Sequence, residues 1–254
     1  MRKLIVGALV GVLALAITAI AMAETVQHYS QNFTAKKTNA LTGTTFQTDS
    51  IDEQNTDRNK QPKRVTNFDI TFPKGTKINY KALAVCKATE SDFTNAGSTP
   101  DKACPTGSKV GTGNVKARIP FQLPGQPEEL TGTVDGYNAK GGLLLWVVVQ
   151  SPIGNQTLLI KPKLKGLTLK TAVPRTCVPP GTPENDCQDS NGQSQEAILT
   201  FFKLNVKSLK GKKTKKPYML TPKTCTGSKW TFSAKITYAD GTSINPTSDT
   251  PCKK

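Results

Sequence analysis

The sequence has 254 residues and a formal net charge of +16, with 34 lysines and arginines against 18 acidic residues. It contains six cysteines and a single histidine, His28. One histidine excludes zinc sites built from two or three histidines, and it argues against a catalytic triad with a histidine base. The length suits one large β domain or two small ones.

Residues 1–23 have the features of a secretory leader. Arg2 and Lys3 form a charged start, the run from Leu4 to Ile20 is almost wholly apolar, and residues 21–23 match the small-x-small cleavage pattern. We expect the mature chain to begin at Glu24, to be exported, and to keep 32 basic and 18 acidic side chains. An uncleaved N-terminal anchor is the alternative, because the apolar run approaches a membrane-spanning length.

Residues 24–64 are polar and rich in Thr, Asn, Gln and Asp. This composition predicts a flexible N-terminal arm. The pieces Tyr29 to Phe33 and Leu41 to Phe46 carry spaced apolar residues, so one or two edge strands are the alternative. The predicted folded domain spans residues 65–254.

Strand patterns begin at Val65, where Phe68, Ile70 and Phe72 alternate with polar residues. The run from Leu143 to Val149 is continuously apolar and predicts a central strand buried on both faces. Similar patterns predict further strands at 114–119, 129–137, 157–160, 167–173, 198–206 and 229–238. No window after the leader has a helical period, so we expect an all-β fold. The predicted class is an antiparallel β-sandwich, immunoglobulin-like or jelly-roll-like, or a barrel.

The cysteines fall into three close pairs in a chain that we expect to be exported, which predicts structural disulfides. Six cysteines allow 15 pairings. Because short loops close at low entropic cost, we expect neighbours to pair. The expected bonds are Cys86–Cys104, Cys177–Cys187 and Cys225–Cys252. A crossed pairing such as Cys86 to Cys252 is the alternative. The cysteine spacing fits no metal or redox site, and no cofactor is predicted.

Paired carboxylates are the one remaining kind of catalytic site that the sequence offers. A glycan hydrolase needs two acids about 5–9.5 Å apart in a cleft. The candidates are Glu128, Glu129, Asp135 and Asp240. The 177–192 loop carries further acids and predicts either a solvated loop or an irregular calcium site. Its acids are Glu184, Asp186 and Asp189.

The densest basic stretch marks the candidate contact with an anionic partner. Its residues are Lys203, Lys207, Lys210, Lys212, Lys213, Lys215 and Lys216. Nucleic-acid binding would require arginines and aromatic residues among the lysines, and it is not expected. A solvated lysine-rich loop is the alternative interpretation.

The segment from Cys104 to Gly113 has the pattern Cys-Pro-x-x-Ser-x-Val-Gly-x-Gly. It resembles a group of uncharacterised secreted actinobacterial proteins built from β-sandwich modules. Further matching positions are Phe72-Pro73-x-Gly75, Trp230-x-Phe232, Asp240-Gly241 and Cys252. The resemblance implies export, a sandwich fold and disulfides, and it implies no activity. The richness in lysine departs from the group.

These features predict a secreted, non-enzymatic protein of the cell envelope or its surroundings. The expected partner is an anionic cell-wall polymer, an acidic glycan or a membrane surface. Two alternatives remain open, which are a carboxylate-dependent glycan hydrolase and a purely structural or adhesive surface module.

Overall fold

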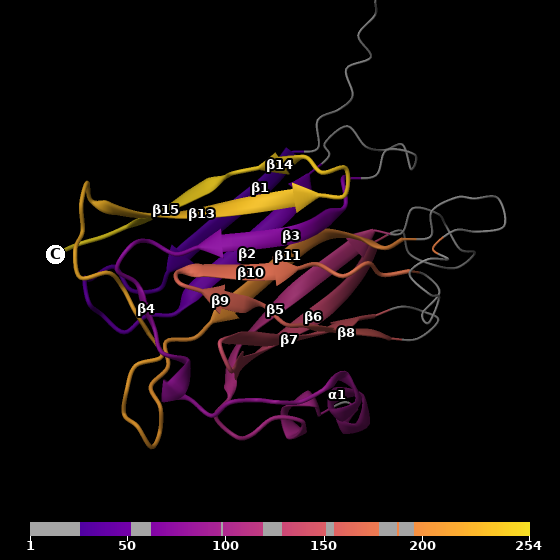
Figure 1. Ribbon diagram of the computed structural model, residues 1–254, viewed down its shortest axis with the longest axis horizontal. Helices are drawn as coiled ribbons and strands as arrows, with labels where there is room; N and C mark the ends of the chain where they lie inside the picture. Colours follow the sequence, from indigo (N-terminus) through magenta and orange to yellow (C-terminus); the bar gives the residue numbers. More distant parts are fainter. Residues whose placement is uncertain are drawn as a thin grey trace, which may run out of the picture.

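Thirteen strands form one curled antiparallel sheet, and two short strands form a separate ribbon (Figure 1). This computed structural model describes residues 26–51, 62–97, 99–118, 129–150, 155–177, 187 and 196–254. The predicted all-β, disulfide-stapled antiparallel class is confirmed. The predicted leader and its signal helix lie outside the described residues.

Three short helical elements lie between β4 and β5, and the other described elements are strands. The strands are β1 (Val26–Phe33), β2 (Thr44–Ile51), β3 (Val65–Thr71), β4 (Lys77–Ile78), β5 (Lys109–Arg118), β6 (Glu129–Ala139), β7 (Gly142–Val149), β8 (Gln156–Ile160), β9 (Lys163–Lys165), β10 (Thr168–Ala172), β11 (Ile198–Val206), β12 (Met219–Leu220), β13 (Lys229–Tyr238), β14 (Ser243–Ile244) and β15 (Thr247–Pro251). The helical elements are η1 (Tyr80–Ala82), α1 (Glu90–Ala96) and η2 (Pro100–Lys102).

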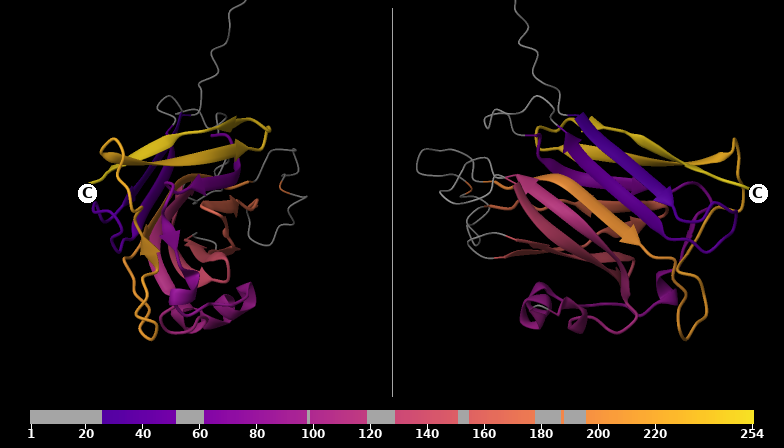
Figure 2. Two further views of the ribbon diagram at one scale, coloured as in Figure 1. Left: turned by 60° about the vertical axis from the view of Figure 1, so that its left-hand side comes forward. Right: turned by 180° about the vertical axis from the view of Figure 1, so that it is seen from behind.

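The large sheet runs in the order β1-β2-β11-β5-β6-β7-β9-β10-β3-β13-β14, with β8 on β7 and β15 on β13. It curls so that its two halves face one another, as the views in Figure 2 show. The rings of Phe46 on β2 and Phe68 on β3 lie 5.2 Å apart across the interior, and those of Phe33 on β1 and Phe232 on β13 lie 4.7 Å apart. The result is a flattened barrel with a sandwich-like core.

The two edges of the curled sheet meet at β1 and β15, where hydroxyl groups replace a backbone ladder. Gln31 N donates to Ser248 Oγ at 2.9 Å, and Ser248 Oγ donates back to Gln31 O at 3.0 Å. Phe33 N donates to Thr250 Oγ1 at 3.2 Å. These bonds satisfy edge groups that would otherwise template pairing with another chain. We call this contact the seam.

The segment 24–64, expected to be a polar arm with edge strands as the alternative, supplies β1 and β2. β1 lies at the end of the sheet, whereas β2 lies between β1 and β11. Phe33 and Phe46 are buried in the core, and Gln31 is 1% exposed. The arm therefore belongs to the same sheet as the domain predicted to start at residue 65.

The apolar run in β7 is buried on both faces, as its sequence predicts. Leu143, Leu145 and Val147 face the interior, while Leu144 and Trp146 lie in a second cluster outside the sheet. The short helix α1 covers that outer face.

This helix is not expected from the sequence, because seven residues are too few to display a helical period. Its local signal is a capping box, in which Thr89 and Asp92 bond to each other's backbone N–H groups. Phe93 is fully buried and stacks on Trp146 at 4.8 Å.

All three expected disulfides are present. They are Cys86–Cys104, Cys177–Cys187 and Cys225–Cys252, and they account for all six cysteines. Within the described ranges, no helix is both long and apolar enough to cross a membrane.

Candidate functional site

The predicted lysine-rich stretch folds into a hairpin that projects from one end of the barrel, at the lower left of Figure 1. Tyr218 N donates to Leu209 O at 2.9 Å, and Gly211 N donates to Lys216 O at 2.9 Å. Thr214 Oγ1 donates to the carbonyl of Ala82 in η1 at 3.0 Å. The hairpin is therefore anchored to η1 through Thr214 of its turn, while the lysine side chains of the turn stay exposed.

Gly211 makes this anchoring possible, because a Cβ at this position would overlap the carbonyl oxygen of Ala82. The turn that follows contains Lys215, which has a positive φ of 56°. The lysines of the turn are exposed.

The hairpin and the residues that follow it form one segment, 207–223, and five other segments reach the same end of the barrel. The loop 34–43 joins β1 to β2 there, since Phe33 and Thr44 are paired residues, and Val206 at the end of β11 pairs with Thr44. The ribbon β4–β12 covers this end, and residues 72–83 surround β4. The turn 139–142 joins β6 to β7, the β9–β10 hairpin occupies 161–167, and residues 251–254 follow β15.

Eighteen lysines lie in these six segments, and all are exposed. They are Lys36, Lys37, Lys74, Lys77, Lys81, Lys140, Lys161, Lys163, Lys165, Lys207, Lys210, Lys212, Lys213, Lys215, Lys216, Lys223, Lys253 and Lys254. The six segments contain no aspartate or glutamate. We call this surface the lysine-rich end.

Buried hydrogen bonds join the loops of the lysine-rich end to one another. Thr221 is 1% exposed, and its hydroxyl donates to Lys37 O at 2.7 Å and accepts from Ala40 N at 2.9 Å. The backbone N–H of Asn39 donates to Pro222 O at 2.9 Å, and that of Lys253 donates to Lys36 O at 2.7 Å. The lysines are thus presented by loops that hold a defined shape.

Several lysines elsewhere on the barrel pair with acids, unlike those of the lysine-rich end. Lys116 pairs with Glu129 at 2.8 Å, and Lys63 pairs with Asp240 at 2.9 Å. Lys170 lies 3.6 Å from Asp69. Among the residues that the structure describes, none of the eighteen lysines forms an ion pair. Their charges therefore add rather than cancel.

Lys203 is the exception among the seven predicted contact lysines. It lies within β11, half-buried on the outer face between Gln47 of β2 and Asn114 of β5. The other six belong to the lysine-rich end.

The acidic candidates for glycan hydrolysis do not come together. Glu129 pairs with Lys116, and Asp240 lies in the turn after β13, close to Lys63. Asp135 lies in β6, where Lys109 Nζ bridges it at 3.0 Å to Asp101 at 2.9 Å. Glu128 lies outside the described residues, as do the three acids proposed for calcium.

Asp101 and Asp135 border a cleft of about 760 Å³ beneath α1, together with Trp146. Partial burial opposes ionisation of Asp101, but hydrogen bonds from Tyr137 at 2.6 Å and from Lys109 outweigh it and lower its pKa. A general acid of a glycosidase requires a raised pKa. Asp101 lacks that property, and the Lys109 ammonium contacts both carboxylates.

His28 lies in β1, opposite Asp49 of β2. In the described part of the chain, no three His, Cys, Asp or Glu side chains lie close enough to hold a metal ion.

The Cys104–Gly113 motif is accounted for by packing. Ser108 is fully buried, and its hydroxyl donates to Pro105 O at 2.7 Å in the turn that starts β5. Gly111 and Gly113 lie so close to β11 that a Cβ on either would overlap a backbone carbonyl oxygen of that strand. These contacts give the motif a structural role at this position.

Twelve lysines of this surface lie outside the predicted contact stretch. A signal for them exists in the sequence, because each lies in a turn, a loop or a short strand within a segment without acids, and alternate connections of an antiparallel sheet share one end. Comparisons of the chain with protein-family models, with curated proteins and with solved structures found no match.

Proposed function

We propose that this is an exported, non-enzymatic protein that binds an anionic polymer or surface of the cell envelope through its lysine-rich end. The observation that carries the proposal is the collection of eighteen exposed lysines in six segments without an acidic residue. Three disulfides favour an oxidising compartment such as the cell exterior.

The physical basis is the sum of like charges on one surface. Uncompensated charges of one sign produce a potential of several kT, which concentrates counter-ions and steers association. Lysine presents a compact charge on a flexible stem, without the planar, two-pronged geometry of arginine. Such a surface suits a partner with repeated anionic groups, such as the phosphates or carboxylates of an envelope polymer or lipid layer.

The test removes the charges of the hairpin turn and measures binding to immobilised phosphate-bearing wall polymer and to anionic phospholipid vesicles. The four substitutions are Lys212→Gln, Lys213→Gln, Lys215→Gln and Lys216→Gln. Each lysine near an anionic surface contributes about 1 kcal/mol, so the affinity should fall at least tenfold. Wild-type binding should also weaken as salt shortens the Debye length from about 10 Å to 3 Å.

A matched control removes four lysines from outside the lysine-rich end and changes the net charge equally. Its substitutions are Lys63→Gln, Lys116→Gln, Lys170→Gln and Lys235→Gln. The control should keep its affinity within about twofold, because three of these lysines are already balanced by nearby acids. Equal losses in the two variants, or binding that ignores salt, would sink the proposal.

A further inference from the structure

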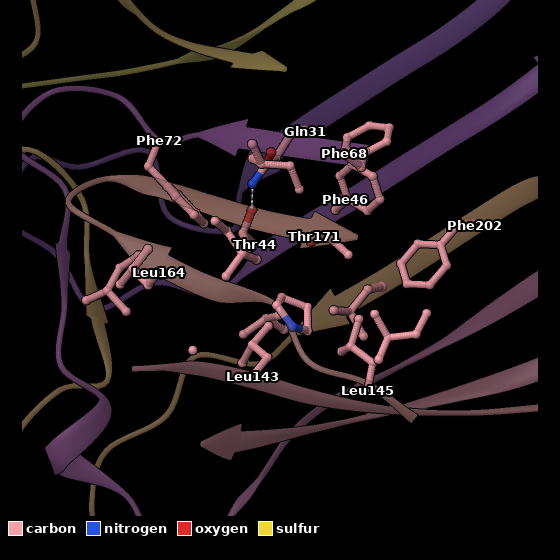
Figure 3. A pocket seen from close by; sticks show the side chains of 18 of the residues that line it. Gln31, Thr44, Phe46, Phe68, Phe72, Leu143, Leu145, Leu164, Thr171 and Phe202 are labelled. Atoms are coloured by element: carbon pink, nitrogen blue, oxygen red, sulfur yellow. Dashed lines mark hydrogen bonds between the residues drawn. The ribbon is translucent and has the colours of Figure 1, made fainter. Parts of the chain in front are cut away.

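The two facing halves of the sheet enclose a cavity of about 110 Å³ (Figure 3). Close-packed interiors hold few voids larger than a water molecule. Rows of side chains from facing strands form its walls, including Phe68 on β3 and Phe72 directly after it, Phe202 and Leu204 on β11, and Leu145 on β7. A packed core with this composition would normally fill such a space.

The side chains of Gln31, Thr44 and Thr48 at the cavity wall already have partners in the protein. Gln31 Nε2 donates to Thr44 Oγ1 at 3.3 Å, and Gln31 Oε1 accepts from Tyr29 at 2.8 Å. The hydroxyls of Thr44 and Thr48 donate to the backbone carbonyls of Asn32 and His28. A water molecule needs two to four polar partners, so these groups leave little to hold one.

The lining contains no Asp, Glu, Lys, Arg or His. Burial raises the pKa of Tyr218, one of the lining residues, so its hydroxyl stays neutral. The lining therefore offers an occupant no charged partner, and most of its residues offer apolar contact.

The sheet forks beside the cavity, between β8 and β10. β9 pairs with β10 through residues 163–165 and 168–170, whereas β8 pairs with β7 through residues 156–160. The last residues of β10, Thr171 and Ala172, pair with β3 on their other side. Among the described residues, no strand joins β8 to this part of β10, and the two diverge in Figure 1.

The side chains that line the cavity differ in burial. At the lysine-rich end Tyr218 is buried, whereas Ile78 of β4 and Leu164 of β9 are half-buried. Ile160 on β8 and Val173 after β10, on either side of the fork, are also half-buried. Partly exposed lining side chains thus occur at both places, and at the fork no described strand covers them, so the cavity is approachable through the fork.

We propose that the barrel interior binds one unbranched hydrocarbon chain, which inserts through the fork between β8 and β10. An engineered cavity of about 150 Å³ lined by apolar side chains binds benzene, so 110 Å³ admits a slender group but excludes a fused ring system. The rows of side chains run along the strands, and this direction suits an extended chain. The site goes beyond the proposed surface function and does not depend on the lysines.

The test uses uncharged probes, so that the lysine-rich end has no part in binding. Primary alcohols from hexan-1-ol to decan-1-ol are titrated into the full protein and followed by calorimetry. Burying each additional CH₂ is expected to tighten binding about fourfold until the cavity is filled. A negative heat-capacity change should accompany binding.

A substitution that fills the mouth checks the location. Thr171→Phe places a ring in the lining and should weaken decan-1-ol binding at least tenfold. Ala172→Phe is the control, because Ala172 is the exposed next residue on β10 and the same ring then lies on the outer face. Val173→Phe replaces Thr171→Phe if circular dichroism shows that the first variant does not fold.

Three results would overturn this proposal. The first is the absence of binding by any alcohol, the second is an affinity independent of chain length, and the third is equal affinity in a folded mouth variant and the control. The four-lysine hairpin variant should bind decan-1-ol like the wild type, so this site can fail or stand separately from the anionic surface.

Discussion

Asp240 shows how a single exposed side chain organises a turn. Its carboxylate accepts hydrogen bonds from Thr242 Oγ1 at 2.6 Å and Thr242 N at 2.9 Å, and it pairs with Lys63 at 2.9 Å. Hydrogen bonds lower the pKa of Asp240 from 3.8 to about 2. The largest effect comes from the Thr242 hydroxyl, followed by Lys63 and the backbone N–H of Thr242. The turn between β13 and β14 thus depends on an ionised carboxylate.

The sign of the pH dependence follows from this lowered pKa. Because the folded chain binds the proton less tightly than the unfolded chain, Asp240 stabilises the fold above pH 3.8 and loses that contribution as the pH falls toward 2. Carbon-13 titration by NMR should give a pKa near 2, and Thr242→Val should raise it more than Lys63→Met. A wild-type pKa close to 3.8 would contradict the described geometry.

At the scale of elements, the seam holds β1 against β15 with side-chain hydroxyls. Ser248→Ala combined with Thr250→Val should lower the free energy of unfolding by about 2–4 kcal/mol, because two backbone N–H groups of β1 lose their acceptors. Thr250 is 2% exposed, so water does not readily replace its hydroxyl. Urea unfolding measures the loss.

Thr247→Val is the control for the seam, since Thr247 is exposed on the same strand and offers no bond to β1. It should change the unfolding free energy by less than about 0.5 kcal/mol. A double variant as stable as this control would mean that packing alone closes the barrel.

Elements with alternating apolar residues were predictable, and those defined by distant partners were not. The alternation around Phe68 and Trp230 correctly predicts β3 and β13, since one face of each strand packs against the core. The helix α1 is shorter than the window that reveals a helical period. Pro162 separates β8 from β9, but the fork beside it depends on pairings with β7 and β10 that no local pattern contains.

At the scale of the whole molecule, the Cys225–Cys252 bond links the segments before β13 and after β15. Its sequence separation of 27 predicts a loss of about 3–4 kcal/mol in the free energy of unfolding when both cysteines become alanine. Removing Cys177–Cys187, with a separation of 10, should cost about 1 kcal/mol less. Urea titrations of the two double variants give the comparison, and the reverse order would contradict the entropic account.

The lysine-rich end is a property of the whole chain and could be predicted only in part. The stretch that includes Lys207 to Lys216 stands out in the sequence, and it supplies six of the eighteen lysines. The others, such as Lys37 and Lys163, are scattered singly or in small groups. Curling of the sheet brings these connections together, so their joint charge follows from strand order.

Charge gathered at one end gives the molecule an electric dipole along its strands. Near a negatively charged body, this dipole experiences a torque within roughly one Debye length, which is about 8 Å at physiological salt. The barrel would therefore rotate before contact and arrive with the β4–β12 ribbon leading. In such a pose the fork between β8 and β10 lies along the flank of the molecule, accessible from the side while the lysines are engaged.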